Sequence, residues 1–290
     1  MRSLTWRVRS SVLVLLLSAL LGGCAVSGNA SSPSGQAARE RLQVAQAMFL
    51  ERCKTAGEKI YRTVDNVEGV FLMKLRPDGI NYGEQFKMND PYGRDAEGLG
   101  YFETLLKGSF PQGDNYRTEW PPRKGYFYVE AIDPKDGQRY RYTGARRAVG
   151  RMDPNAPNVQ VDLKRDPNFD LNIYRFVLDK VAANGPAQRY GVTYDDISTK
   201  EERDYWIAGS SLRIIDFHTN EVIAERIGYM LDLGQGSTHG GRAPWLAAAD
   251  YACPNFHRFA NPVVRNPGFS GQLRQTQDFV EKVLKPLESK

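Results

Sequence analysis

The sequence predicts an α+β fold in which an antiparallel β-sheet, built from hairpins, has an N-terminal and a C-terminal helix packed on it. Apolar residues recur at three- and four-residue steps near both ends of the folded part of the chain, which is the period of one helical face. Between them, short apolar segments alternate with turns that contain Gly, Asn, Asp or Pro, as in hairpins. No regular alternation of strands with helices calls for a parallel sheet.

The first helix is predicted over residues 37–62. Its apolar face consists of residues at helical spacing: Leu42, Ala45, Phe49, Cys53, Ala56 and Ile60. Cys53 is therefore expected on the buried side of this helix. The helix is expected to end near Arg62, where the pattern shortens to that of strands.

The middle of the chain is predicted to be mainly strands. They are expected over residues 69–75, 126–132, 138–143, 171–178, 188–194, 206–217 and 221–231. The last two form the clearest hairpin because of their Val, Ile, Tyr and Trp content. The segments 126–132 and 138–143 flank an Asp-Gly turn, and 171–178 and 188–194 are expected to pair around Asn184-Gly185-Pro186. Residues 153–168, with three prolines, are expected to be mostly loop.

Two helices are predicted near the end of the chain. A short one covers residues 244–252 and precedes Cys253-Pro254. Ser270 is a suitable N-cap for the final helix. Its apolar face is expected to contain Leu273, Val280, Val283, Leu284 and Leu287.

The first 24 residues have the three regions of a secretory signal peptide. Arg2, Arg7 and Arg9 precede a short apolar run over residues 12–21, which small residues follow. The stretch from Leu21 through Gly22 and Gly23 to Cys24 resembles the lipobox of bacterial lipoproteins. Two alternatives are an uncleaved membrane anchor and an ordinary signal peptide that happens to contain a cysteine.

The resemblance implies a cellular location and a lipid anchor. In that family the cysteine is acylated and the signal is removed before it, so residues 1–23 are the expected signal peptide and Cys24 the expected lipidation site. Ala25 stands where an aspartate favours retention in the inner membrane. The protein is therefore expected to be lipid-anchored in the outer membrane and to face the periplasm. Residues 24–36, rich in Ser, Gly and Ala, are the expected tether. Residues 37–290 are the expected single periplasmic domain.

The charge of the processed chain argues against nucleic acid as a partner. The signal peptide contains three of the 39 Lys and Arg residues and none of the 34 Asp and Glu residues, so its removal leaves a formal charge of +2. The remaining basic residues are scattered, whereas nucleic-acid binding normally requires a clustered basic face.

Cys53 and Cys253 remain once Cys24 is assigned to the lipid. In an oxidising compartment an isolated pair most simply forms one disulfide. Such a bond would close a loop of roughly 200 residues, for which chain entropy gives about 5 kcal/mol as an upper bound. Two separate buried thiols or a redox site are the alternatives, although no CxxC motif is present.

The glycine-rich segment 234–242 is the first candidate for a binding site. Its glycines allow a ligand to approach the backbone closely. Hydroxyl, imidazole and guanidinium groups are also present. The candidate binding residues are Gly236, Ser237, Thr238, His239 and Arg242. The segment lacks a P-loop pattern, and the chain has no GxSxG motif, so a plain connecting loop is the alternative.

Three histidines limit the possible acid–base or metal chemistry. His218 lies in a predicted turn, whereas His239 and His257 flank the short helix near Asp250. No zinc-binding spacing is present, so no metal or cofactor is expected. The sequence therefore predicts a non-enzymatic binding or scaffold module of the cell envelope, with a protein or envelope component as partner. The alternative is a periplasmic hydrolase that uses His239 with Asp250 or His257.

Overall fold

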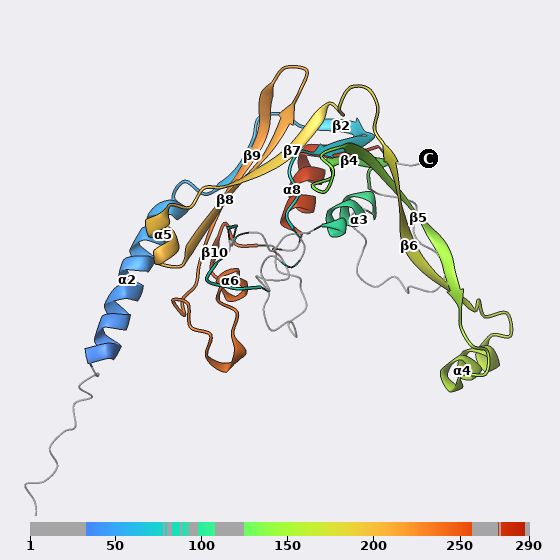
Figure 1. Ribbon diagram of the computed structural model, residues 1–290, viewed down its shortest axis with the longest axis horizontal. Coiled ribbons are helices and arrows are strands. Elements are labelled where there is room, and N and C mark those ends of the chain that lie inside the picture. Colours follow the sequence, from blue (N-terminus) through green and yellow to red (C-terminus); the bar gives the residue numbers. More distant parts are fainter. Residues whose placement is uncertain are drawn as a thin grey trace, which may run out of the picture. The chain divides into compact units, whose positions relative to one another are not determined.

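A computed structural model describes most of the chain from Pro33 onwards (Figure 1). The described residues are 33–77, 79, 83–87, 89, 90, 92, 98–107, 125–256, 272 and 274–287. The expected signal peptide, Cys24 and most of the tether lie outside them. The chain divides into two units, Met1–Arg41 and Leu42–Lys290, and the helix α2 (Pro33–Cys53) contains the boundary. The folded architecture below belongs to the second unit.

One large sheet organises this unit, and a small parallel pair accompanies it. Nine of the described strands form the large sheet, in the order β1-β9-β8-β7-β3-β4-β5-β6, with β10 also paired to β9. These strands are β1 (Gly57–Ile60), β3 (Gly69–Leu72), β4 (Tyr128–Ile132), β5 (Arg139–Arg151), β6 (Asn172–Ala182), β7 (Tyr190–Asp196), β8 (Ile207–Asp216), β9 (Glu221–Leu231) and β10 (Ala252–Cys253). The parallel pair is β2 (Val64–Val67) with β11 (Leu284–Pro286).

The predicted α+β class is confirmed, and the sheet is mostly antiparallel. The exception is β3, which pairs in parallel with both β4 and β7. Parallel neighbours require a crossover connection, and between β3 and β4 the chain passes through the helix α3 (Leu99–Lys107). The expectation of a purely antiparallel arrangement was therefore wrong at β3 in the large sheet and at the separate β2–β11 pair. A long Gly- and Asp-rich stretch separates β3 from α3 and obscured the crossover in the sequence pattern.

Two predicted hairpins are confirmed and one is wrong. β8 and β9 pair along their length, and β4 and β5 pair across the Asp-Gly turn. β5 continues well beyond its predicted end at residue 143. β6 pairs with this extension of β5, whereas β7 pairs with β3 and β8. The expected pairing of β6 with β7 was wrong because both strands have other partners.

The helix boundaries also differ from the prediction. α2 ends at Cys53, and β1 occupies part of the segment expected to continue the helix. Within the expected loop 153–168 lies the helix α4 (Pro157–Arg165), which begins with a proline at a position that tolerates it. The short helix α6 (Pro244–Ala248) and the final helix α8 (Gln275–Val283) are present, but Leu284 already belongs to β11. Ser270 and Leu273 lie outside the described residues.

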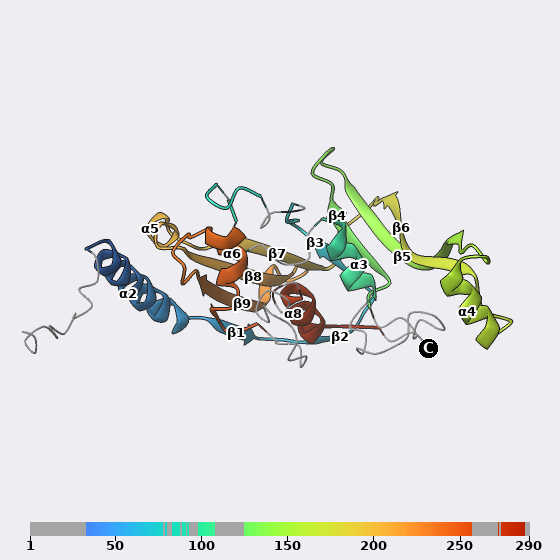
Figure 2. The ribbon, with the colours of Figure 1, turned by 90° about the horizontal axis from the view of Figure 1, so that it is seen from below.

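The main core lies between the sheet and helices α3 and α8. Figures 1 and 2 show α3, α6 and α8 on the same face of the sheet. Buried members of this core include Val129, Val192 and Ile214 from the strands, Phe102 and Leu105 from α3, and Phe279, Val280 and Val283 from α8. None of the helices in the described part of the chain is both long and apolar enough to cross a membrane.

The β8–β9 half of the sheet is buried on both faces. Ile207 and Ala208 are neighbours in β8 and both are fully buried, although successive strand residues point to opposite faces. Ile207 packs with Ala45 and Phe49 of α2, whereas Ala208 packs with Trp245 of α6. Helical segments therefore cover this half from both sides.

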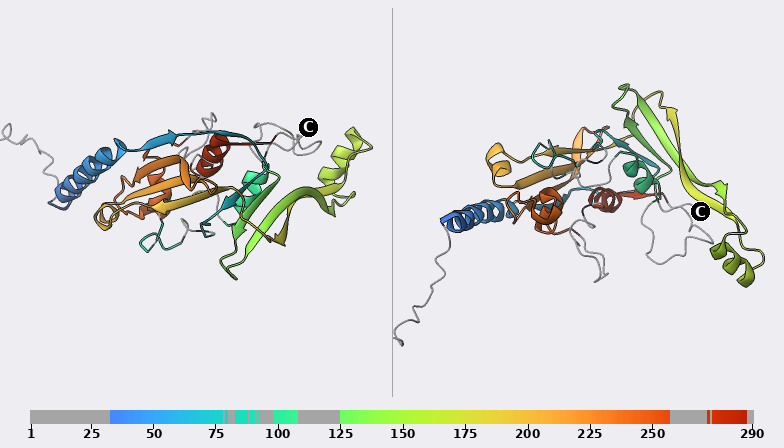
Figure 3. Two further views of the ribbon diagram at one scale, coloured as in Figure 1. Left: turned by 90° about the horizontal axis from the view of Figure 1, so that it is seen from above. Right: turned by 60° about the horizontal axis from the view of Figure 1, so that its bottom comes forward.

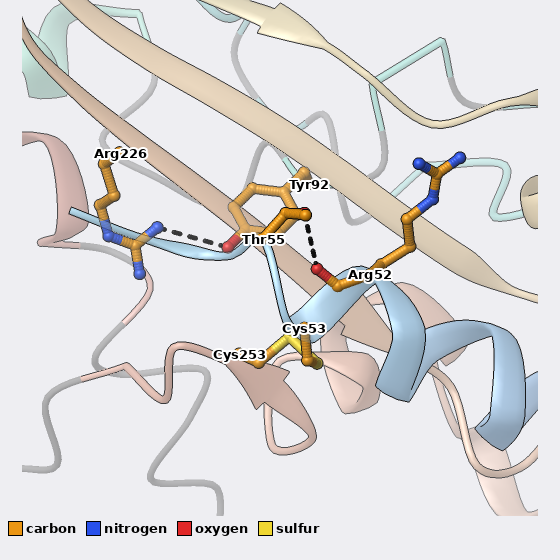
Figure 4. The surroundings of a disulfide bond; sticks show 6 residues. All are labelled: Arg52, Cys53, Thr55, Tyr92, Arg226 and Cys253. Carbon is orange, nitrogen blue, oxygen red and sulfur yellow. Dashed lines mark hydrogen bonds between the residues drawn. A yellow bond between two sulfur atoms is a disulfide. The ribbon is translucent and has the colours of Figure 1, made fainter. Parts of the chain in front are cut away.

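The early and late parts of the chain meet at one edge of β9. β1 pairs with β9 from Ala224 to Ile227, and β10 pairs with the next residues, Tyr229 and Met230. The disulfide joins Cys53, at the end of α2 just before β1, to Cys253, the last residue of β10, with 5.6 Å between the Cα atoms (Figure 4). The predicted disulfide is confirmed.

The opposite end of the sheet forms a long projection, here called the β5–β6 arm (residues 144–178). Figure 3 shows the two strands leaving the sheet and ending in α4. The strand segments of the arm are mostly exposed, and Val159 is the buried residue of α4. Val149, Val161 and Ile173 are exposed apolar residues of the arm.

Candidate functional site

The glycine-rich loop after β9 is organised around a buried carboxylate. Asp232 is fully buried and accepts hydrogen bonds from the backbone N–H groups of Gly234 (2.9 Å) and Gly236 (2.8 Å). Arg242 binds both carboxylate oxygens, with Nη1 at 3.0 Å from Oδ2 and Nη2 on Oδ1. The sequence predicts that the Arg242 guanidinium binds a ligand. In the structure it is already paired with the carboxylate of Asp232, the residue that follows β9.

Gly236 has a steric reason to be glycine. Its φ is 84°, and a Cβ atom at this position would lie 2.3 Å from the indole ring of Trp206. Ser237, Thr238 and His239 are exposed on the outer side of the loop. They remain candidate binding residues, but the conformation of the loop is already explained by Asp232, Arg242 and Trp206.

The structure describes two of the three side chains proposed for the alternative hydrolase. His239 and Asp250 are both exposed. His257 lies outside the described residues. Within the part of the chain that the structure describes, no group of three or more His, Cys, Asp or Glu side chains is arranged to bind a metal ion.

A cavity lies beside the disulfide, and the sequence interpretation did not identify it. It encloses about 310 Å³ between β1, β9, the segment after β10 and α8. Its lining residues are Gly57, Glu58, Arg226, Pro254, Asn255, Phe256, Gln275, Asp278, Phe279 and Lys282. Gly57 follows Cys53 by four residues and Pro254 follows Cys253 directly, so the disulfide connects two walls of the cavity.

Arg226 is the main charged group of the cavity wall. It is 6% exposed, and its Nη1 donates to Tyr92 Oη at 3.4 Å and to Gln275 Oε1 at 3.3 Å (Figure 4 shows the first bond). The carboxylate paired with it is that of Glu58, at 3.8 Å from Nε. Glu58 is closer to Lys282, whose Nζ lies at 2.6 Å from Oε2. The neutral acceptors of Arg226 are thus nearer than its carboxylate.

The orientation of the Gln275 amide follows from this contact. A guanidinium has donors only, so the carbonyl oxygen of the amide must face Arg226. The amide nitrogen Nε2 is then left buried, and it has no hydrogen-bond partner among the described residues. A donor buried in this way is uncommon in native proteins and calls for an explanation.

A contrasting electrostatic cluster lies at the end of β8. Asp216 is fully buried and accepts two hydrogen bonds from Arg189, at 2.9 and 2.8 Å, and another from Arg62. The hydrogen bonds from Arg189 contribute most to holding the pKa of Asp216 well below its usual range, and the His218 backbone N–H and Arg62 also lower it. This carboxylate is saturated with donors and stabilises the corner between β8 and β9.

The β5–β6 arm provides a second surface with an unusual charge. Its strand segments 144–151 and 172–178 contain four arginines and no Asp or Glu. Arg147 and Arg175 lie directly opposite each other in the strand register, an unfavourable arrangement for like charges, and Arg147 is compensated by Asp179, with Nη1 at 3.0 Å from Oδ1 and Nη2 on Oδ2. At the end of the arm, a hollow of about 290 Å³ is lined by Arg151, Leu163 and residues 167–172.

Sequence interpretation missed the cavity residues for different reasons. Arg226 did carry a signal, because it alternates with Ala224, Gly228 and Met230 and so occupies a buried register of β9. Gln275 carried none, since a polar residue at the start of a helix is ordinarily exposed. No protein-family model matches this chain, and no match was found among the curated proteins or the solved structures.

Proposed function

We propose that this protein is an outer-membrane lipoprotein whose periplasmic domain acts as a non-enzymatic binding module of the cell envelope. The lipobox resemblance at Leu21 to Cys24 supports the anchor and the location. In this proposal α2 and α8 are the terminal helices that brace the sheet, and the β5–β6 arm contacts the partner.

The observation that carries the binding role is the arm itself. An isolated two-stranded ribbon is marginally stable in water, because it has too little apolar surface to bury. The arm adds four arginines on its strands and exposes Val149 and Ile173. Its outer strand, β6, is the last of the described strands in the sheet order, so its outer edge has no strand partner within the part of the chain that the structure describes. Open strand edges pair readily with an extended segment of another protein. The basic charge favours an acidic segment.

The anchor is tested by Cys24→Ser. The variant is expected to lose fatty-acid labelling and to leave the membrane fraction, because serine has no thiol to acylate. The control is Cys53→Ser, which removes a cysteine that the proposal does not lipidate. A Cys24→Ser protein that is still labelled and still sediments with outer membranes would rule out this anchor.

The arm is tested by photo-crosslinking in cells that express the full chain. A photoreactive amino acid at Val149 or Ile173 is expected to give discrete adducts, whereas the same residue at Tyr61, which is 67% exposed on the body of the domain, should not. Changing Arg147 and Arg175 together to Glu should abolish the adducts. Lys59→Glu, a charge reversal at an exposed position of β1, is the matched control. Adducts that persist in the double reversal would refute the acidic partner.

A further inference from the structure

The cavity beside the disulfide contains a desolvated cation, Arg226, whose carboxylate partner among the described residues is Glu58, at 3.8 Å. Elsewhere in this protein, Arg242 and Arg189 each bind both oxygens of a buried aspartate. Arg226 is more buried than either of them, yet its nearby acceptors are a phenol and an amide. A buried charge is costly unless an opposite charge and hydrogen bonds compensate it. The cavity is therefore suited to a ligand that brings a negative charge closer to Arg226 than Glu58 does.

One donor group is open to such a ligand. Nη2 of Arg226 makes no hydrogen bond within the part of the chain described here, and it is not among the fully enclosed polar atoms, so it is open to the cavity. The Gln275 amide nitrogen also lacks a partner in the described residues, but it is enclosed and does not face the cavity. A carboxylate accepts charge-assisted hydrogen bonds on its oxygens, so it matches the open nitrogen of the guanidinium.

The surrounding charges do not oppose an anion. The carboxylate of Glu58 is shared between Lys282 at 2.6 Å and Arg226 at 3.8 Å. Asp278 is paired with Arg274 at 3.6 Å. Among the described lining residues, the cations Arg226 and Lys282 balance the carboxylates Glu58 and Asp278, and each carboxylate has a basic partner.

The size and the apolar wall limit the ligand to a small molecule or a chain end. The volume of about 310 Å³ is at the lower limit of small-molecule sites. Phe256 and Phe279 provide aromatic surface beside the polar groups. We infer that this cavity binds a small carboxylate, such as a peptide C-terminus or a short organic acid, through Arg226, which Gln275 holds in place. The inference is independent of the lipid anchor and of the arm.

Isothermal titration calorimetry of the full mature chain in detergent micelles tests this inference. The probes are N-acetylalanine, its neutral isostere N-acetylalaninamide, and butyrate. N-acetylalanine is expected to bind with a Kd of about 1 mM or below. The neutral amide should bind at least tenfold more weakly, because it offers no charge to Arg226. Butyrate distinguishes the two sources: equal binding indicates any short acid, and weaker binding indicates a peptide end.

Variants locate the site. Arg226→Met and Gln275→Glu should each weaken N-acetylalanine binding at least tenfold, the first by removing the cation and the second by adding a like charge at nearly constant size. Arg147→Met, on the exposed arm, should leave binding unchanged. Thermal melts identify a variant that fails to fold, and in that case the other variant decides. The inference is overturned by equal binding of acid and amide, by no binding of either acid up to 10 mM, or by a folded Arg226→Met protein that retains affinity.

Discussion

The β8–β9 pair and the β5–β6 pair contrast within a single sheet. Both are long antiparallel ladders between consecutive strands. β8 is buried almost throughout, with helices against both faces, whereas β6 is mostly exposed or half-buried. The backbone hydrogen bonding is similar in the two ladders, so backbone pairing cannot account for the difference. Stability depends on the layers that cover a strand pair, and an uncovered pair makes a smaller contribution to it. The β5–β6 arm is therefore expected to contribute less to stability than the β8–β9 pair, and the proposed partner would cover the surface that it exposes.

The largest difference between the two regions should appear when the disulfide is removed. The double variant Cys53→Ser/Cys253→Ser is expected to lower the free energy of unfolding by about 2–5 kcal/mol, because the cross-link closes a long loop in the unfolded chain. Urea unfolding measures the total loss in the free energy of unfolding. Hydrogen exchange should show the loss of protection concentrated in β1, β9 and β10. A loss of hydrogen-exchange protection centred on the β5–β6 arm would contradict this expectation.

A matched pair of core truncations measures the effect of the covering layers. Ile214 in β8 is fully buried, and Ile173 in β6 is 39% exposed. Ile214→Ala should cost about 3 kcal/mol of unfolding free energy, and Ile173→Ala less than about 1 kcal/mol. Urea unfolding of both variants gives the ratio of the two losses in unfolding free energy. Equal losses would mean that the arm is as tightly packed as the β8–β9 half.

The loop after β9 offers a smaller effect that also tests its predicted binding role. Arg242→Ala leaves Asp232 buried with only its backbone donors, so we expect a loss of about 1–3 kcal/mol in unfolding free energy. His239→Ala, at an exposed position, should change stability by less than about 0.5 kcal/mol. Thermal melts and complementation of a deletion strain are measured together. Failure of a fully stable His239→Ala protein to complement would show that the loop has a functional role.

The smallest of these effects concerns acid stability. The pKa of Asp216 is lowered in the folded chain, chiefly by hydrogen bonds from Arg189. Its stabilising contribution is therefore complete above the unfolded pKa of about 3.9 and is lost as pH falls below that value. Asp216→Asn should flatten the decrease in unfolding free energy between about pH 5 and pH 2. Asp179→Asn, in β6 next to the arm, removes an exposed carboxylate paired with Arg147 and is the control. Unchanged acid dependence in Asp216→Asn would mean that Asp216 is not the responsible group.

Sequence patterns predicted the parts of the fold that depend on local order. The β8–β9 hairpin followed from its strand content and turn. The disulfide followed from cysteine counting, because Cys53 and Cys253 are the pair that remains once Cys24 is assigned to the lipid. The insertion of β3 between β4 and β7 could not be predicted in this way, since it pairs residues more than fifty positions apart. α4 was hidden because its prolines were interpreted only as helix breakers.

The candidate cavity was beyond prediction for a similar reason. It brings together Glu58, Arg226, Phe256 and Gln275, which come from four separate segments of the chain. Of these, Arg226 had a visible signal in the alternation of β9. The glycine-rich loop was predicted as a binding site because of its composition. The packing of the loop around Asp232 and Trp206 already explains why glycine is present.

The shared edge of β9 also has a consequence for the timing of folding. Cys53 and β1 are synthesised nearly two hundred residues before Cys253 and β10, yet both strands complete the same edge. Likewise, the partner of β2 is β11, which is synthesised late because it lies close to the last described residues. A chain interrupted before residue 252 would therefore keep a reactive thiol at Cys53 and an incomplete edge at Tyr229 and Met230. Thiol labelling would then distinguish finished molecules from truncated ones, so that the oxidation state of one cysteine reports whether synthesis reached the far end.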